Sequence, residues 1–113
     1  ANVACNARAL GATVSLVGVI GDDTAAADLR GLLEGRGIAA HRLIVDAARP
    51  TTRKTRLATT RNQQVARVDV ESAADLGAAV ATAVADAVED AAASAGVVVV
   101  SDYLKGVVTP GVM

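Results

Sequence analysis

The amino-acid sequence predicts an α/β fold: a partial three-layer sandwich with a mostly parallel sheet, helices on its faces and an added β-hairpin. Three observations support this prediction. Residues 97–100 are consecutive valines, typical of a strand buried on both faces of a parallel sheet. Residues 13–37 contain a strand, an acidic turn, a helix and a glycine stop, which together form a βα unit. Residues 72–94 have the regular apolar spacing of a helix that covers the sheet.

The loop after the valine run is the first candidate site. Ligands of parallel α/β sheets gather at the carboxyl ends of the strands, and here that end holds Ser101, Asp102, Tyr103 and Lys105. An acid, a base and a glycine that leave the sheet together could hold a sugar hydroxyl or a metal-bound anion. The alternative is a solvated loop in which Asp102 merely caps the turn, and spacing alone does not separate the two interpretations.

Composition limits the classes of protein to consider. Of the 113 residues, 52% are hydrophobic, but most of these are Ala and Val, and Tyr103 is the only aromatic. Small side chains bury little area, so we expect marginal stability for the chain alone. The net charge of −1 gives no bulk attraction to nucleic acids or membranes. A single cysteine, Cys5, no apolar run of membrane-spanning length and no signal peptide together predict a cytoplasmic protein.

The N-terminal part predicts a helix and then a strand. Residues 2–10 suit a helix, because apolar residues recur on one side and Gly11 follows. Asn2 and Asn6 share another face, where two amides could bind a polyol or cap a neighbouring strand. Residues 13–20 have the composition of a strand.

A second helix is predicted over residues 23–35. Asp22 is the expected N-cap, and Leu29, Leu32 and Leu33 are the expected buried stripe. Asp22 and the adjacent Asp23 could bind a metal, but capping explains them more simply. A short strand is expected over residues 43–45. The only histidine, His41, has no metal-ligating partner nearby and is expected at the surface.

A hairpin is predicted next, with strands near residues 52–59 and 64–70 joined through residues 61–63. Residues 49–67 include no acidic residue but several basic ones: Arg49, Arg53, Lys54, Arg56, Arg61 and Arg67. One interpretation is a basic face that receives a phosphorylated small molecule. The other is a solvated edge hairpin whose arginines prevent aggregation. Nucleic acid is disfavoured as a partner, because residues 49–67 include no aromatic side chain to stack on bases.

The covering helix over residues 72–94 is expected to begin with a capping box formed by Ser72 and Asp75. Its buried stripe is expected at Leu76, Val80, Val84 and Val88. Thr109 and Pro110 have the pattern of a further helix start. Because the chain opens inside a helical pattern and stops soon after this start, we expect an internal piece of a larger protein.

Several segments resemble those of the ribokinase-like sugar kinases. The superfamily signature is matched by Ala-Asn-Val-Ala at 1–4, Leu-Gly-Ala at 10–12 and Val-Gly-Val-Ile-Gly-Asp-Asp at 17–23. Later segments are similar to those of the D-glycero-β-D-manno-heptose 7-phosphate kinases: Arg-Asn-Gln-Gln at 61–64, Arg-Val-Asp at 67–69 and Ser-Asp-Tyr-Leu-Lys-Gly at 101–106. The resemblance covers nearly the whole chain and implies that residues 1–113 are part of a single sugar kinase domain.

This resemblance implies an ATP-dependent, Mg²⁺-requiring kinase that phosphorylates the anomeric hydroxyl of a heptose phosphate on the way to ADP-heptose. Asn2 matches the family asparagine that contacts sugar hydroxyls. Asp102 and Lys105 match the loop at the junction of sugar and phosphate, and Arg67 and Asn62 belong to the substrate side. The implied partners are a sugar phosphate and ATP, without nucleic acid or membrane, and the complete protein is a candidate homodimer.

Two family segments do not occur within residues 1–113. These are the paired glycines expected before Ala1 and the Gly-Ala-Gly-Asp segment, with its general base, expected beyond Met113. We therefore expect no catalytic residue and no metal ligand in this chain, and no activity from it alone. The alternatives are a kinase for another sugar, such as ribose or fructose, and a non-catalytic α/β sugar-binding module.

Overall fold

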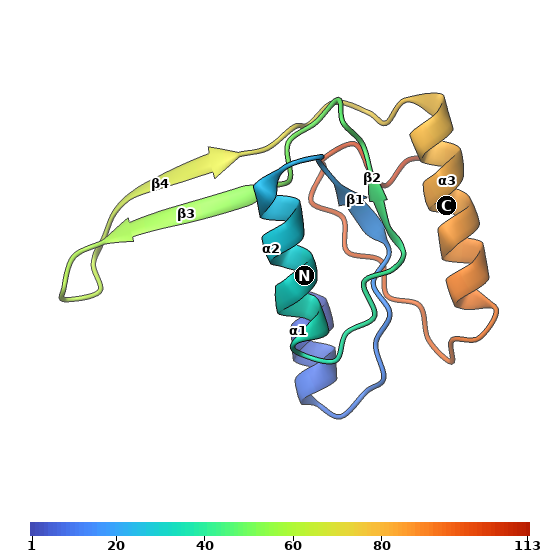
Figure 1. Ribbon diagram of the computed structural model, residues 1–113, viewed down its shortest axis with the longest axis horizontal. Helices are drawn as coiled ribbons and strands as arrows, with labels where there is room; N and C mark the ends of the chain where they lie inside the picture. Colours follow the sequence, from blue (N-terminus) through green and yellow to red (C-terminus); the bar gives the residue numbers. More distant parts are fainter.

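Three helices surround a pair of parallel strands, and a long hairpin projects from this body (Figure 1). The structure is a computed structural model that describes residues 1–113. In chain order, its elements are α1 (Asn2–Ala9), β1 (Gly18–Ile20), α2 (Thr24–Glu34), β2 (Leu43–Val45), β3 (Arg53–Ala58), β4 (Gln64–Val70) and α3 (Ala78–Ala92).

Strands β1 and β2 pair in parallel, with Val19 opposite Ile44. An isolated bridge between Ser15 and Ala39 precedes the pair. Regular pairing is therefore shorter than the predicted strand over residues 13–20. The Leu16 N–H still donates to the Ala39 carbonyl at 3.0 Å, but neither Leu16 nor Val17 belongs to a strand. The βα unit and the strand over residues 43–45 are confirmed.

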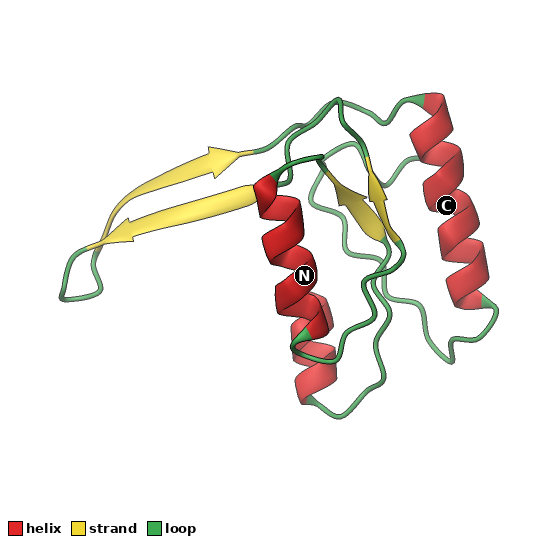
Figure 2. Ribbon diagram, in the orientation of Figure 1, coloured by secondary structure: helices red, strands yellow, loops and turns green.

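The strand pair lies between α1 and α2 on one side and α3 on the other (Figure 2). Helices α1 and α2 pack against the strands through small and branched side chains: Ala4, Ile20, Ala26, Leu33, Ile38, Ala40 and Leu43. Val84 of α3 is also buried, at 2% exposed. This arrangement confirms the α/β class, with a parallel part of two strands and a separate antiparallel hairpin.

The predicted caps of α2 and α3 are wrong. Asp23, not Asp22, caps α2, because its extended backbone lets Oδ1 accept the Ala26 N–H at 2.9 Å. Helix α3 begins after Gly77, without a side-chain cap. The Ser72 hydroxyl instead accepts the Ala74 N–H at 3.3 Å in a local turn, so it is not available as a helix cap.

The predicted apolar stripe of α2 is correct only in part. Leu33 is 1% exposed and Leu29 packs against the core, whereas Leu32 is 57% exposed. Leu29 and Leu33 are four residues apart and lie on one side of the helix, while Leu32 is turned away from that side.

The strand predicted over residues 97–100 is not formed. The valines at these positions are 53–79% exposed, and no backbone hydrogen bond joins them to another segment. A β-branched run becomes a strand only where a neighbouring strand accepts and donates its hydrogen bonds, and β1 pairs with β2 alone. Farther on, the Thr109 carbonyl accepts N–H bonds from Val112 and Met113, giving a single turn where a helix start is predicted.

Candidate functional site

An open groove of about 1630 Å³ runs between the N-terminal part of the chain and residues 94–108. Its walls are mostly apolar and come from α1, β1, α3 and the valine run. Three of the predicted substrate-binding residues, Asn2, Asp102 and Lys105, line this groove, although they come from distant parts of the sequence. Asn62 and Arg67 lie outside it. Lys54 and Glu71 add further charged groups to its wall.

Asp102 has a local structural role. Its Oδ1 accepts the N–H of Leu104 at 2.8 Å, and Leu104 has a positive φ of 55°. This is the turn-capping arrangement considered as the alternative for Asp102. Its Oδ2 makes no hydrogen bond within the chain, so one carboxylate oxygen is available to a ligand in the groove.

Five charged side chains form a continuous series, which we call the ion-pair ladder. It runs from Arg67 through Asp69, Lys54 and Glu71 to Lys105. The N–O distances along it are 2.9, 3.0, 2.9 and 2.6 Å in that order. The ladder exists because Arg67 and Asp69 share one face of β4, Glu71 directly after the strand continues the same alternation, and Lys54 is opposite Asp69. It links Arg67 to Lys105, two predicted substrate residues that are distant in the sequence.

The ladder shifts the pKa values of its two carboxylates and of Lys54. The Lys105 ammonium, followed by that of Lys54, lowers the pKa of Glu71 below its ordinary value of 4.5. Hydrogen bonds from Lys54 and then Arg67 lower the pKa of Asp69. Glu71 and Asp69 in turn raise the pKa of Lys54. These shifts favour the charged forms of Glu71, Asp69 and Lys54 at neutral pH.

The basic face predicted for the hairpin is neutralised in part. Asp69 and Glu71, which follow Arg67 in the sequence, form ion pairs with Lys54, and Asp69 also pairs with Arg67. Arg53, Arg56 and Arg61 make no ion pair. Arg56 lies directly opposite Arg67 in the strand register, and two like charges at opposed positions repel, so an anion bound between them would be stabilised.

Arg49 is a site residue whose role the sequence did not reveal. Its side chain is 8% exposed and pairs with Asp46 at 3.0 Å. Its other nitrogens donate to the carbonyls of Lys105 at 3.1 Å and Ala74 at 2.8 Å. The close spacing of Asp46 and Arg49 after β2 signals the ion pair, but no local signal identifies the two carbonyls.

Gly106 completes the docking of the Lys105 loop. Its φ is 70°, and a Cβ at this position would collide with the carbonyl of Ala74. The Gly106 carbonyl also accepts the N–H of Leu76 at 3.2 Å. A glycine is therefore required where the loop meets the segment before α3.

The loop between β3 and β4 forms the far end of the projecting hairpin (Figure 1), and Asn62 in this loop is exposed and does not line the groove. Its φ of 58° and the bond from its N–H to the Thr59 carbonyl at 2.9 Å assign it to the turn. Asparagine tolerates this left-handed conformation better than most residues. The predicted hairpin and its turn are confirmed. The left-handed backbone of this turn is sufficient to explain why an asparagine occupies position 62.

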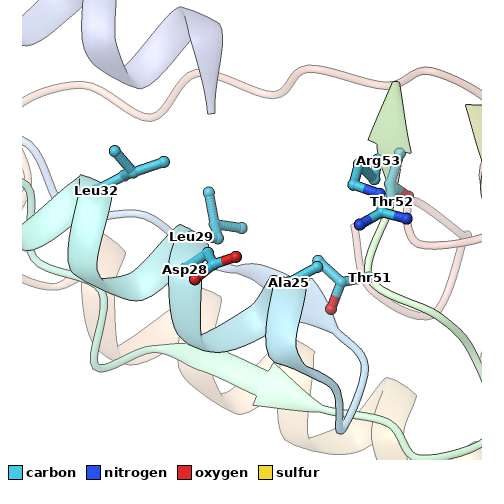
Figure 3. A pocket seen from close by; sticks show the side chains of 7 residues that line it. All are labelled: Ala25, Asp28, Leu29, Leu32, Thr51, Thr52 and Arg53. Atoms are coloured by element: carbon cyan, nitrogen blue, oxygen red, sulfur yellow. The ribbon is translucent and has the colours of Figure 1, made fainter. Parts of the chain in front are cut away.

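A smaller hollow of about 200 Å³ separates α2 from the start of β3 (Figure 3). Its polar wall includes Asp28 of α2 and Arg53 of β3. Below it, the Thr51 N–H donates to Asp23 Oδ2 at 2.8 Å and the Thr51 hydroxyl accepts the Gly21 N–H at 2.9 Å. These bonds fix the base of the hairpin to the turn before α2. None of the predicted site residues lines this hollow.

Residues 1–113 contain no group of three or more His, Cys, Asp or Glu side chains arranged to hold a metal ion. No magnesium ligand is therefore assigned to them. None of the helices is both long and apolar enough to span a membrane.

Comparison with known proteins gives a consistent result. The chain matches the family described as pfkB family carbohydrate kinase over residues 1–110. It is 49% identical over 114 aligned positions to the bifunctional protein HldE of Azorhizobium caulinodans, covering 100% of this chain and 24% of that protein. HldE of Caulobacter vibrioides is 45% identical, with 99% of this chain and 22% of the relative covered. HldE of Citrifermentans bemidjiense is 41% identical, with 99% and 23% covered.

The chain spans about a quarter of the length of these curated relatives. The family match, by contrast, extends over almost every residue of the chain, including α1, the βα unit, the hairpin and the loop around Lys105. Residues 1–113 belong to the pfkB family of carbohydrate kinases.

Proposed function

We propose that this chain is the substrate-side part of an ATP-dependent kinase that phosphorylates a sugar phosphate. The proposed acceptor is the anomeric hydroxyl of D-glycero-β-D-manno-heptose 7-phosphate, on the route to ADP-heptose. The observation that supports this most directly is that Asn2, Asp102 and Lys105 line one groove. The identity of the sugar rests on the resemblance of residues 61–64 and 101–106 to the heptose 7-phosphate kinases.

The groove residues suit three different tasks. The Asn2 amide can both donate to and accept from sugar hydroxyls, and the free oxygen of Asp102 can accept from one. The Lys105 ammonium can attract a phosphate as a point charge. Arg67 and Asn62 on the hairpin are proposed to contact the phosphorylated end of the sugar, and the ion-pair ladder connects Arg67 to Lys105 at the groove.

Other parts of the reaction are assigned to residues beyond this chain. ATP supplies the phosphoryl group, and Mg²⁺ offsets the charge on its phosphates. The general base is expected beyond Met113, so residues 1–113 should be inactive alone and form one piece of a larger kinase domain. The cytoplasmic location and the homodimer expected from the sequence belong to the same proposal.

The test is a substrate titration with the complete protein that contains this chain. Heptose 7-phosphate, fructose 6-phosphate and ribose are compared as acceptors, with ATP and Mg²⁺ present. We expect the highest kcat/KM with heptose 7-phosphate, and a preference for ribose or fructose 6-phosphate would contradict the proposed acceptor. Lys105→Ala should lower phosphoryl transfer, whereas Arg36→Ala, an exposed cation outside the groove, should leave it unchanged. An unchanged rate in Lys105→Ala would contradict the role of this lysine.

A further inference from the structure

Glu71 joins the hairpin to the loop that contains Lys105. Its Oε2 lies 2.9 Å from the Lys54 ammonium on β3, and its Oε1 lies 2.6 Å from the Lys105 ammonium. Strands β3 and β4 pair only with each other, so their pairing gives the hairpin no contact with the parallel strands. Of the ion pairs in the structure, only the one between Glu71 and Lys105 connects the hairpin to residues 101–106.

The main chain and side chain of Lys105 are held separately. Arg49 binds its carbonyl oxygen, and this bond leaves the four-carbon side chain free to rotate. Glu71 binds the ammonium at the end of that side chain with a short, charge-assisted hydrogen bond. Lys54, Glu71 and Lys105 all line the groove, so the carboxylate of Glu71 fixes two cations on the groove wall.

We propose that Glu71 is a positioning residue for the sugar kinase reaction, which holds the Lys105 ammonium and the hairpin in one arrangement at the groove. This inference rests on the proposed function. Without the carboxylate charge, the Lys105 side chain regains its rotamer freedom, and a substrate phosphate must then immobilise it at an entropic cost. The hairpin also loses its ionic connection to the loop, so the position of Arg67 relative to Lys105 is no longer fixed.

The first measurement is independent of activity. Trypsin cleaves after lysine, so the rate of cleavage between Lys105 and Gly106 reports how firmly the loop is held. In the complete protein without substrate, Glu71→Gln should be cleaved at this bond several-fold faster than the unmodified protein. The matched control is Asp90→Asn, which removes an exposed carboxylate of α3 that does not line the groove and pairs with Arg42 instead of with residues 101–106. Equal cleavage in Glu71→Gln and Asp90→Asn would overturn the proposed link.

The second measurement is kinetic. Glu71→Gln should lower kcat/KM for the sugar phosphate about tenfold or more, because small displacements of a substrate-positioning group are costly. Glu71→Asp keeps the charge but is one methylene shorter, so it should restore part of the loss. Faster cleavage with unchanged kinetics in Glu71→Gln would overturn the positioning role. If the complete protein phosphorylates no sugar phosphate, the proposed function fails, and the cleavage rates still decide whether Glu71 holds Lys105.

Discussion

Arg49 donates a hydrogen bond to the carbonyl oxygen of Lys105 across 3.1 Å, although 56 residues separate them in the sequence. The same guanidinium binds Asp46 and the carbonyl of Ala74. One almost buried side chain therefore ties together the end of β2, the segment before α3 and the loop at the groove. The fork of donors on arginine makes this possible, since a lysine ammonium is a single point charge.

Arg49→Ala should destabilise the complete protein by about 3–5 kcal/mol, because it leaves the Asp46 carboxylate buried without its partner. Arg49→Lys keeps the positive charge but cannot reach both carbonyls, so it should recover only part of this stability. Denaturant unfolding of both variants measures the effect. Arg36→Ala, on an exposed turn, is the control and should change stability by no more than about 0.5 kcal/mol. Equal stability of Arg49→Lys and the unmodified protein would show that the two carbonyl bonds contribute nothing.

The two adjacent leucines of α2 provide a test of the core. Leu33→Ala should lower the free energy of unfolding by about 2–5 kcal/mol, because Leu33 is 1% exposed and its removal leaves a cavity. Leu32→Ala removes the same atoms from a side chain that is 57% exposed, so its effect should be much smaller. Urea unfolding of the two variants compares them directly. Similar losses in both would contradict the observed orientation of α2.

Local patterns predicted much of the fold. The βα unit, the hairpin and its turn depend on neighbouring residues: Gly and Asp after a strand, and Asn62 between two β-favouring runs. The failures have a common physical cause. Four valines at residues 97–100 have high strand propensity, but pairing requires a partner that propensity does not supply. Serine is also a good helix cap, but the Ser72 hydroxyl accepts the Ala74 N–H and the Ala74 carbonyl accepts from Arg49. This segment therefore forms a turn, and α3 begins only after Gly77.

Resemblance to a family predicted which residues belong to the candidate site, but it did not predict how their side chains are arranged. The segments around Asn2, Asp102 and Lys105 were identified by resemblance, and they line one groove. The ladder was not predicted, because Glu71 and Lys105 are 34 residues apart and only the fold brings them together. Counting charges along the chain therefore gave a basic hairpin, whereas the folded hairpin pairs Lys54 and Arg67 with acids and leaves Arg53, Arg56 and Arg61 without an ion pair.

The ladder should make the protein sensitive to acid. The pKa values of Glu71 and Asp69 lie below their ordinary values of 4.5 and 3.8, mainly because of Lys105 and Lys54 respectively. The Thr51 N–H lowers the pKa of Asp23 in the same direction. A lowered pKa adds stability that is present above the ordinary value and lost as the pH falls through the folded value.

We therefore expect titration of these three carboxylates to leave the thermal midpoint of the complete protein unchanged from neutral pH down to about pH 4.5. At lower pH the midpoint should decline. The Glu71→Gln variant should show a shallower decline, because one of the three carboxylates no longer titrates. Melting curves at a series of pH values, at constant ionic strength, measure this difference. Identical profiles for Glu71→Gln and the unmodified protein would contradict the contribution of Glu71.

Arg67→Ala should mainly raise KM for a phosphorylated sugar, by about tenfold, since a charge-assisted hydrogen bond to the substrate phosphate is lost. Arg53→Ala is a matched control, because Arg53 belongs to the same hairpin but faces the opposite side from Arg67 in the strand register. Steady-state kinetics of the complete protein, with heptose 7-phosphate and the unphosphorylated heptose, separate the two contributions. An equal rise in KM for both sugars would assign Arg67 to hairpin structure, whereas a rise confined to the phosphorylated sugar would assign it to the phosphate.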